Sequence, residues 1–152
     1  MERTFIIVKP DAMQRGLAGE IIKRFEQRGL RIVGLKLMLA GRELAETHYG
    51  EHREKGFFPG LVNFITSSPV IVAVLEGVNA IEAVGGTVGL TNPAKSPPGS
   101  IRADYGVDLG RNLVHRSDGA ESAAREIGLW FKPEELLAWR RSTDEWIFEP
   151  QQ

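Results

Sequence analysis

The chain has 152 residues, a length that fits one compact domain able to bury its own core. Its nineteen basic and twenty acidic residues give a formal net charge of -1, so we expect no nucleic-acid partner and no attraction to anionic membranes. Cysteine is absent, which excludes disulfides, thiolate catalysis and cysteine-ligated metals. The sequence also lacks a signal-peptide pattern and an apolar run of about 18 residues, so we expect a cytoplasmic protein with no membrane partner.

In the first half of the chain, strand-like and helix-like segments follow one another. Short apolar runs rich in β-branched residues predict buried strands at residues 4–9, 31–39 and 69–75. Apolar residues at helical spacing predict helices at residues 16–27, 42–52 and 57–66. Residues 11–15 are polar, and we expect them to form a loop after the first strand.

The middle of the chain contains a long segment with little regular pattern. Asn79 is a suitable N-cap for a brief helix, which the glycines at positions 85 and 86 should cause to fray. Residues 89–110 follow and are rich in glycine and proline. A loop of this length inside a compact domain is usually functional or disordered.

The last third returns to regular structure. A short strand is expected at residues 113–115, and Asp118 or a neighbour should cap a helix that extends to Trp130. Pro133 should open one more short helix. Strands and helices interleave, and some strands follow one another too closely for long parallel crossovers. We therefore predict an α+β fold with one sheet and helices on one face.

The most informative segment is residues 111–118, in which His115 is surrounded by an amide, two arginines, a hydroxyl and a carboxylate. Imidazole can act as a neutral nucleophile near pH 7 without a base to deprotonate it, so His115 could accept a phosphoryl group and pass it on. The alternative is a histidine that only completes a hydrogen-bond network at a strand end. Ser117 or Glu126 could orient its ring, although Glu126 could also be an ordinary charge on a helix face.

A phosphate site in this chain must be built from side chains, because the P-loop and the glycine-rich dinucleotide pattern are both absent. Lys9 and His115 fall at strand ends, where ligands tend to gather in sheets of this kind. Each candidate, taken alone, is more often a solvated surface charge than a phosphate ligand. The phosphate-binding candidates are Lys9, Arg15, Thr91, Arg102, Arg111 and Asn112.

Two further patterns have a structural and a functional interpretation. His48 and His52 are four residues apart on an expected helix, a spacing that suits a metal pair, but the H-E-x-x-H pattern is absent. Phe57 and Phe58 fit a hydrophobic core, although an exposed aromatic ring could also stack on a nucleobase.

Several segments together resemble the nucleoside diphosphate kinase family. The resemblance is collinear and covers nearly the whole chain, and its strand-end Lys-Pro-Asp and its Arg-Asn-x-x-His-x-Ser-Asp element are specific in combination. The segments that carry it are residues 2–11, 14–17, 19–26, 57–61, 91–93, 98–102, 110–112 and 125–130.

This resemblance implies a ferredoxin-like βαββαβ core with a four-stranded antiparallel sheet. It implies a single domain over residues 1–152, with a C-terminal tail from about residue 139. The implied activity is Mg²⁺-dependent, ping-pong transfer of the γ-phosphate of a nucleoside triphosphate to a nucleoside diphosphate. The implied assembly is a homohexamer, favoured by the long tail, with a tetramer as the other possibility.

The resemblance also implies roles for individual residues at the matching positions. His115 would be the phosphorylated nucleophile, supported by Ser117 and Glu126, and Asp118 would lie near the metal through water. Phe57 would stack on the base, with Leu61 and Leu109 beside it. The residues that would hold phosphate and ribose are Lys9, Tyr49, Thr91, Arg102 and Asn112.

Three positions depart from the family pattern. A phosphate-contacting arginine of the family aligns with Gly85, and the family's small residue after the histidine is Arg116. Our hypothesis is that Arg116 partly restores the missing charge from the opposite side of the site. The alternative is that it points to solvent or to a neighbouring subunit. Leu90 also replaces an acidic residue that the family often carries.

An active phosphotransferase is therefore the leading interpretation. The alternative is a low-activity family member that serves as a nucleotide-binding or scaffolding subunit. Gly85 favours this alternative, whereas the other catalytic and binding residues, which match the family pattern, argue against it.

Overall fold

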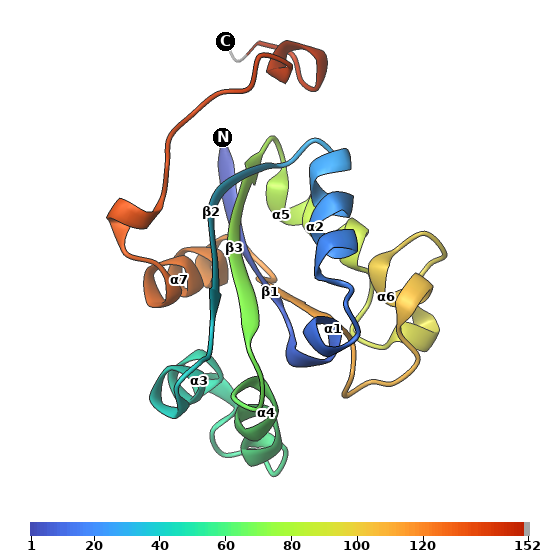
Figure 1. Ribbon diagram of the computed structural model, residues 1–152, viewed down its shortest axis with the longest axis vertical. Coiled ribbons are helices and arrows are strands. Elements are labelled where there is room, and N and C mark those ends of the chain that lie inside the picture. The colour runs from blue at the N-terminus through green and yellow to red at the C-terminus, as the bar shows by residue number, and fades with distance from the viewer. Residues whose placement is uncertain (151–152) are drawn as a thin grey trace.

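The computed structural model describes residues 1–150, so the last two residues of the expected domain lie outside the described part of the chain. Its centre is one antiparallel sheet in the strand order β2-β3-β1-β4, which confirms the predicted ferredoxin-like α+β fold (Figure 1). Among residues 1–150, no helix is both long enough and apolar enough to cross a bilayer. The strands are β1 (Glu2–Val8), β2 (Arg31–Met38), β3 (Val70–Gly77) and β4 (Val114–Arg116).

Helices cover both faces of this sheet, so the prediction of helices on one face is wrong. Figure 1 shows α2, α5 and α6 on one side and α3 and α7 on the other. Side chains alternate along a strand, and both sets are buried in β1: Ile6 and Val8 belong to one core cluster, Phe5 and Ile7 to a second. The helices are α1 (Pro10–Gln14), α2 (Ala18–Gln27), α3 (Arg42–His48), α4 (Phe58–Ile65), α5 (Ala80–Val88), α6 (Ile101–Tyr105) and α7 (Ala120–Trp130).

Two segments expected to be loops contain helices. Residues 11–15 lie largely in α1, which Pro10 opens at the first helical position, where a missing N–H costs nothing. The long segment 89–110 contains α6, and the Ser100 hydroxyl caps that helix by accepting a hydrogen bond from the N–H of Ala103 at 3.3 Å. Both helices have five residues, too few for apolar periodicity to reveal them.

The expected boundaries of two helices also need correction. α3 ends at His48, and a separate 3-10 turn (Gly50–His52) follows it. α5 continues past its two glycines to Val88, which is fully buried in the core and anchors the last turn. The N-cap of α7 is Gly119, which agrees with the expectation that Asp118 or a neighbour caps this helix. Pro133 opens a 3-10 turn (Pro133–Glu135), and Asn79 is the N-cap of α5, although its side chain makes no capping hydrogen bond.

The C-terminal tail leaves α7 and returns to the end of the sheet that carries the N-terminus (Figure 1). Its anchor is Asp144, which is buried and accepts hydrogen bonds from Arg31 of β2 at 2.6 Å and from Arg141 at 2.7 Å. The guanidinium of Arg31 also pairs with Glu76 of β3. The tail is thus fastened to two strands by a network of buried charges, in which each charge has a partner.

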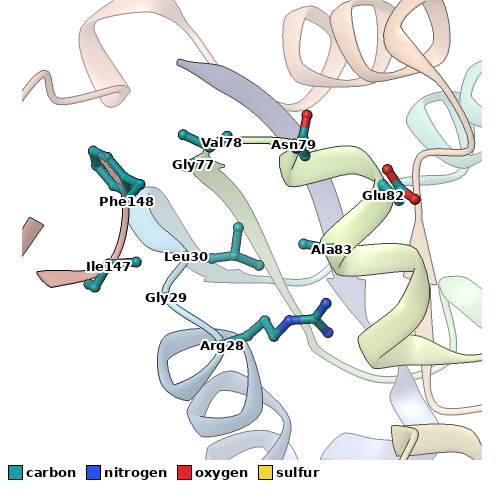
Figure 2. A pocket seen from close by; sticks show the side chains of 10 residues that line it. All are labelled: Arg28, Gly29, Leu30, Gly77, Val78, Asn79, Glu82, Ala83, Ile147 and Phe148. Carbon is teal, nitrogen blue, oxygen red and sulfur yellow. The ribbon is translucent and has the colours of Figure 1, made fainter. Parts of the chain in front are cut away.

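The end of the tail closes one wall of a pocket of about 300 Å³ (Figure 2). Ile147 and Phe148 face this pocket from the tail, and Arg28 and Leu30 face it from the α2–β2 connection. Gly29 lies between them with φ +101°, and a Cβ built on it would come within 2.6 Å of the Ile147 side chain. Glycine is therefore required here both by its backbone conformation and by the contact with the tail.

We expect Gly29→Ala to lower the free energy of unfolding by about 1–2 kcal/mol, because an L-residue is strained in this backbone region. The contact with Ile147 should also loosen the tail. Chemical denaturation measures the first effect, and limited proteolysis of the tail measures the second. Gly19→Ala is the matched control, because Gly19 is an exposed helical glycine with open space around it. That change should stabilise the protein by roughly 0.5–1 kcal/mol. Equal effects of the two substitutions would contradict the prediction.

Candidate active site

The backbone just before β4 is held in an unusual conformation. Leu113 has φ +77°, a region that residues other than glycine rarely adopt. Its N–H donates to the Asp11 carboxylate at 3.0 Å, and its carbonyl accepts from the backbone N–H of Lys9 at 2.9 Å. These bonds fix the direction in which the chain enters β4. The strained residue therefore lies two positions before His115, within the site itself.

His115 is oriented by a buried carboxylate. Its Nε2 lies 2.5 Å from Oε1 of Glu126, which projects from α7 and is 4% exposed. The hydroxyl of Ser117 donates to the same oxygen at 3.1 Å. A carboxylate at Nε2 favours the tautomer with its proton on that nitrogen, which leaves a lone pair on Nδ1. Nδ1 is therefore the nitrogen available for attack on an electrophile.

A second histidine packs against the first. The ring of His48 lies 4.7 Å from that of His115, centroid to centroid, and its Nδ1 accepts a hydrogen bond from the indole N–H of Trp130 at 3.1 Å. Burial, together with the positive charges nearby, lowers the pKa of His48 to about 2. His48 is thus neutral and forms an uncharged wall beside His115.

His48 and His52 do not lie on one helix, because α3 ends at His48, and the His52 ring packs near Phe57. Instead, donor atoms of His48, His115 and Glu126 lie within 4.8 Å of one another. Hydrogen bonds to Trp130 and between His115 and Glu126 already occupy atoms of this group. We therefore assign no metal to it.

Lys9 is the cationic side chain at the end of β1. Its Nζ donates to the side-chain oxygen of Asn112 at 2.8 Å, and the Asn112 amide donates in turn to the carbonyl of Thr91 at 3.1 Å. These bonds join the first strand, the long connection and the entrance to β4. Burial and the nearby charge of Arg102 lower the pKa of Lys9 to about 8. An ammonium that is short of compensating charge is a strong partner for an anion.

Arg102, from α6, lies along the free edge of β4. Its Nε and Nη2 donate to the carbonyls of Asn112 at 3.1 Å and Val114 at 2.6 Å. The side chain is 6% exposed, and burial followed by the charge of Arg116 lowers its pKa to about 10. Lys9, which is half-buried, and Arg102, which is buried, thus bring two positive charges close to the histidine.

The residues expected to contact the base and ribose have contrasting exposure. Phe57 and Leu109 are 54% and 59% exposed, and Leu61 is half-buried. Tyr49 is buried directly after His48, and burial raises the pKa of its hydroxyl to about 12, so it remains a neutral hydrogen-bonding group. The exposed aromatic ring of Phe57 is free to stack on a planar ligand.

Asp118 is exposed beside the histidine. Its carboxylate accepts a hydrogen bond from Ser122 at 2.7 Å. This bond, with the nearby positive charge of Arg116, lowers the pKa of Asp118 below its ordinary value. It is an ionised oxygen ligand at neutral pH, which is the donor type that Mg²⁺ prefers.

Two candidate phosphate ligands have other roles in this structure. Arg15 donates to the carbonyl of Tyr105 at 2.7 Å, and Arg111 packs over the ring of Phe64 at 4.1 Å. Conversely, the positions of Asp11 and His48 beside the catalytic segment were not predicted. Asp11 could have been found from the Lys-Pro-Asp motif at the strand end, whereas no local pattern marks His48 as a neighbour of His115.

We expect nucleotide binding to weaken as the pH rises above about 8, because Lys9 can attract phosphate only in its protonated form. The apparent affinity for ADP should fall by up to about tenfold for each pH unit above this value, as linkage to one proton requires. Calorimetric titration of ADP at several pH values measures the slope. Lys9→Arg should remove it, because an arginine side chain does not titrate in this range. An unchanged slope in that variant would refute the assignment to Lys9.

An oriented histidine among buried cationic side chains is typical of a phosphotransferase that works through histidine. Comparison with known proteins agrees with this class. A family model described as nucleoside diphosphate kinase matches residues 2–136. A nucleoside diphosphate kinase of Carboxydothermus hydrogenoformans is 62% identical, over 98% of this chain and 100% of its own length. That of Archaeoglobus fulgidus is 55% identical, over 98% and 99%.

Solved structures give the same result. A nucleoside diphosphate kinase family protein from Babesia bovis has a TM-score of 0.95 at 49% identity, over 97% of this chain and 100% of that one. A nucleoside diphosphate kinase from Halobacterium salinarum, in complex with CDP, has a TM-score of 0.94 at 50% identity, over 97% and 99%. The chain therefore belongs to the nucleoside diphosphate kinase family.

Proposed function

We propose that this protein transfers the γ-phosphate of a nucleoside triphosphate to a nucleoside diphosphate in two steps through His115. Membership of the nucleoside diphosphate kinase family supports the phosphotransfer itself. The observation that carries the role of His115 is the contact of its Nε2 with Glu126, which directs a lone pair to Nδ1.

In the first step, Nδ1 of His115 attacks the γ-phosphorus, a P–N bond forms, and the bond from that phosphorus to the bridging oxygen of the β-phosphate breaks. The nucleoside diphosphate leaves. A second diphosphate then attacks the phosphohistidine through a terminal oxygen, and the P–N bond breaks. The proton on Nε2 stays with the imidazole–Glu126 pair throughout. Lys9 and Arg102 offset negative charge on the phosphoryl group, and Asn112 positions Lys9.

The proposed nucleotide contacts divide the ligand into two parts. Lys9, Arg102, Thr91, Asn112 and Tyr49 hold phosphate and ribose, while Phe57 stacks on the base beside Leu61 and Leu109. Stacking does not depend on the hydrogen-bonding groups at the edge of a base, and every base has a π-face. We therefore propose broad base tolerance. The Halobacterium salinarum relative was solved with CDP, a pyrimidine diphosphate, which is consistent with a diphosphate ligand here.

Mg²⁺ is the proposed cofactor, carried in with the nucleotide. The residues present fit such an ion, because Asp118 offers one exposed, ionised carboxylate close to the histidine. Mg²⁺ commonly binds through one or two carboxylates and substrate phosphates while keeping several waters. When bound, the ion would neutralise charge on the phosphates, and Asp118 would hold it through water.

We further propose that the protein is a homo-oligomer, with a hexamer favoured over a tetramer, and that it resides in the cytoplasm. β2 is an edge strand, and its side chains Leu35 and Leu37 are 47% and 64% exposed, as is Leu39 just beyond it at 64%. An apolar row on a sheet edge is the kind of surface that a second copy of the chain covers. Light scattering on the wild type and on Leu37→Glu would test this, because loss of the interface should lower the molecular mass.

The proposed function is tested by incubating the protein with γ-labelled ATP and Mg²⁺, removing nucleotide, and measuring label on the protein. We expect acid-labile, alkali-stable label that added GDP removes as labelled GTP. Nucleotide binding without label would instead support the alternative of a low-activity binding subunit. Labelled protein that does not pass its label to GDP would contradict the ping-pong sequence.

A further inference from the structure

The residue after the catalytic histidine points to the other side of the sheet. In the β1–β4 ladder, His115 pairs with Ile7 and Arg116 pairs with Ile6. Neighbouring side chains of a strand project from opposite faces, so Arg116 faces α5. There its guanidinium lies directly over Gly85, since a Cβ built on Gly85 would be 3.4 Å from Cζ of Arg116. Arg116 and Gly85, which are far apart in the sequence, therefore pack against each other.

No ion pair joins Arg116 to a carboxylate within residues 1–150, although its positive charge lowers the pKa of the nearby Asp118. Arg116 lines an open depression of about 540 Å³ with Glu2 and Asp118, but the structure records no ion pair for it. Both acids have other partners, because Glu2 accepts from the N–H of Ile81 at 2.8 Å and Asp118 accepts from Ser122. The hydrogen bond of Arg116 to the Ser117 carbonyl is long, at 3.5 Å.

The positive charge of Arg116 also acts on another cation. After burial, it is the largest cause of the lowered pKa of Arg102, and Arg102 in turn lowers the pKa of Lys9. Arg116 thus lies near Arg102, and Arg102 near Lys9, and no carboxylate forms a salt bridge with Arg116 in the described part of the chain. Like charges held together in this way repel each other. Asp11 offsets part of this repulsion at Arg102 and Lys9, and an anion bound between the side chains would offset more of it.

We propose that Arg116 binds a terminal phosphate of the nucleotide together with Arg102, and that Gly85 provides the space in which its guanidinium lies. This inference rests on the proposed phosphotransfer function and adds a phosphate ligand on the α5 side of the sheet. Asp118 and Ser122 remain paired with each other, which leaves Arg116 available to the ligand.

Gly85 is the residue that gives the Arg116 guanidinium its space. It lies inside α5, where glycine is a poor helix former, so a reason other than helix stability must account for it. An added Cβ would just touch the guanidinium at 3.4 Å, whereas a longer side chain would occupy its position. Position 85 therefore controls where Arg116 can lie, without itself touching the nucleotide.

The first test compares ADP and AMP binding by calorimetry in the wild type and in Arg116→Ala. A charge-assisted contact to phosphate predicts that ADP affinity falls roughly ten- to a hundredfold. AMP, which lacks the terminal phosphate, should change less than about twofold. Arg42→Ala is the matched control, because Arg42 is an exposed arginine at the start of α3. Equal losses for ADP and AMP, or no loss for either, would overturn the proposal.

A second variant keeps the positive charge of Arg116 but changes the position of its guanidinium. Gly85→Leu should displace the guanidinium and reproduce most of the loss in ADP affinity, although Arg116 is still present. Gly19→Leu is its control, because Gly19 is an exposed helical glycine with open space around it. If Gly85→Leu binds ADP like the wild type, the role assigned to Gly85 is wrong. This variant keeps the proposal testable even if Arg116→Ala does not fold.

The double variant Gly85→Arg with Arg116→Gly tests the coupling between the two positions. It supplies the guanidinium from the helix instead of the strand, and we expect ADP affinity within a fewfold of the wild type. Single effects that simply add would show that the two positions act independently and would reject the pairing. Formation of the phosphoenzyme by the wild type tests the proposed phosphotransfer separately from the role of Arg116. Label on the wild type with unchanged ADP affinity in Arg116→Ala would refute only this proposal.

Discussion

Replacing His115 with alanine should abolish phosphoenzyme formation and reduce turnover by at least about a thousandfold, as the loss of a covalent nucleophile does in other enzymes. No other described side chain offers a free imidazole nitrogen beside Lys9, since Nδ1 of His48 is bonded to Trp130. The measurement is the initial rate of GTP formation from ATP and GDP, together with retention of label on the protein.

The control for this variant is nucleotide binding, which should be nearly unchanged because the phosphate ligands remain. The structure also predicts the site of phosphorylation on the ring. Because Glu126 engages Nε2, NMR of the phosphorylated protein should show phosphate on Nδ1. Phosphate on Nε2, or residual label in His115→Ala, would contradict the proposed mechanism.

The second large effect is expected from Glu126→Gln, which keeps the shape of the side chain but removes its charge. An amide can donate a hydrogen bond to Nε2, and the imidazole proton would then move to Nδ1 and block the attacking lone pair. An analogous change in a serine protease triad lowers turnover by about ten-thousandfold through the wrong tautomer. We expect the single-turnover rate of phosphorylation, measured by rapid quenching, to fall by roughly a hundred- to ten-thousandfold.

Two observations would distinguish this effect from simple misfolding. ADP affinity should stay close to that of the wild type, because Glu126 does not face the phosphates in the proposed mechanism. Glu121→Gln, an exposed glutamate at the start of the same helix, should leave the phosphorylation rate unchanged. A Glu126→Gln variant that phosphorylates at the wild-type rate would remove the tautomer argument.

Two of the strands were predictable from sequence because their apolar side chains run nearly continuously, at residues 4–9 and 69–75. Residues 4–9, 31–39 and 69–75 were each expected as strands, and each overlaps an observed strand with small differences at the ends. The same continuous pattern indicates burial on both faces, which should have favoured two helical layers over one. That inference requires considering which face of the sheet each apolar side chain would occupy, and not only the tendency of these residues to form a strand.

Parts of the site depend on contacts that sequence does not encode locally. His48 approaches His115 only because α3 and α7 cover the same face of the sheet and meet through Trp130. Likewise, the contact of Arg116 with Gly85 follows from the one-residue alternation of β4 and from the position of α5. Strand periodicity alone places these two side chains on opposite faces but does not identify what each one meets.

The bonds from Arg102 to β4 have a consequence for the whole sheet. β4 is an edge strand, and without Arg102 the carbonyl of Val114 would be open to any chain able to pair with it, whereas that of Asn112 also accepts from the backbone N–H of Val114 at 2.9 Å. Arg102 takes the place of a fifth strand there, and a charged guanidinium is a poor template for further pairing. A substitution at Arg102 would therefore expose an unpaired, aggregation-prone sheet edge and would also weaken phosphate binding. Loss of solubility in such a variant would reflect this uncovered edge rather than any change in chemistry.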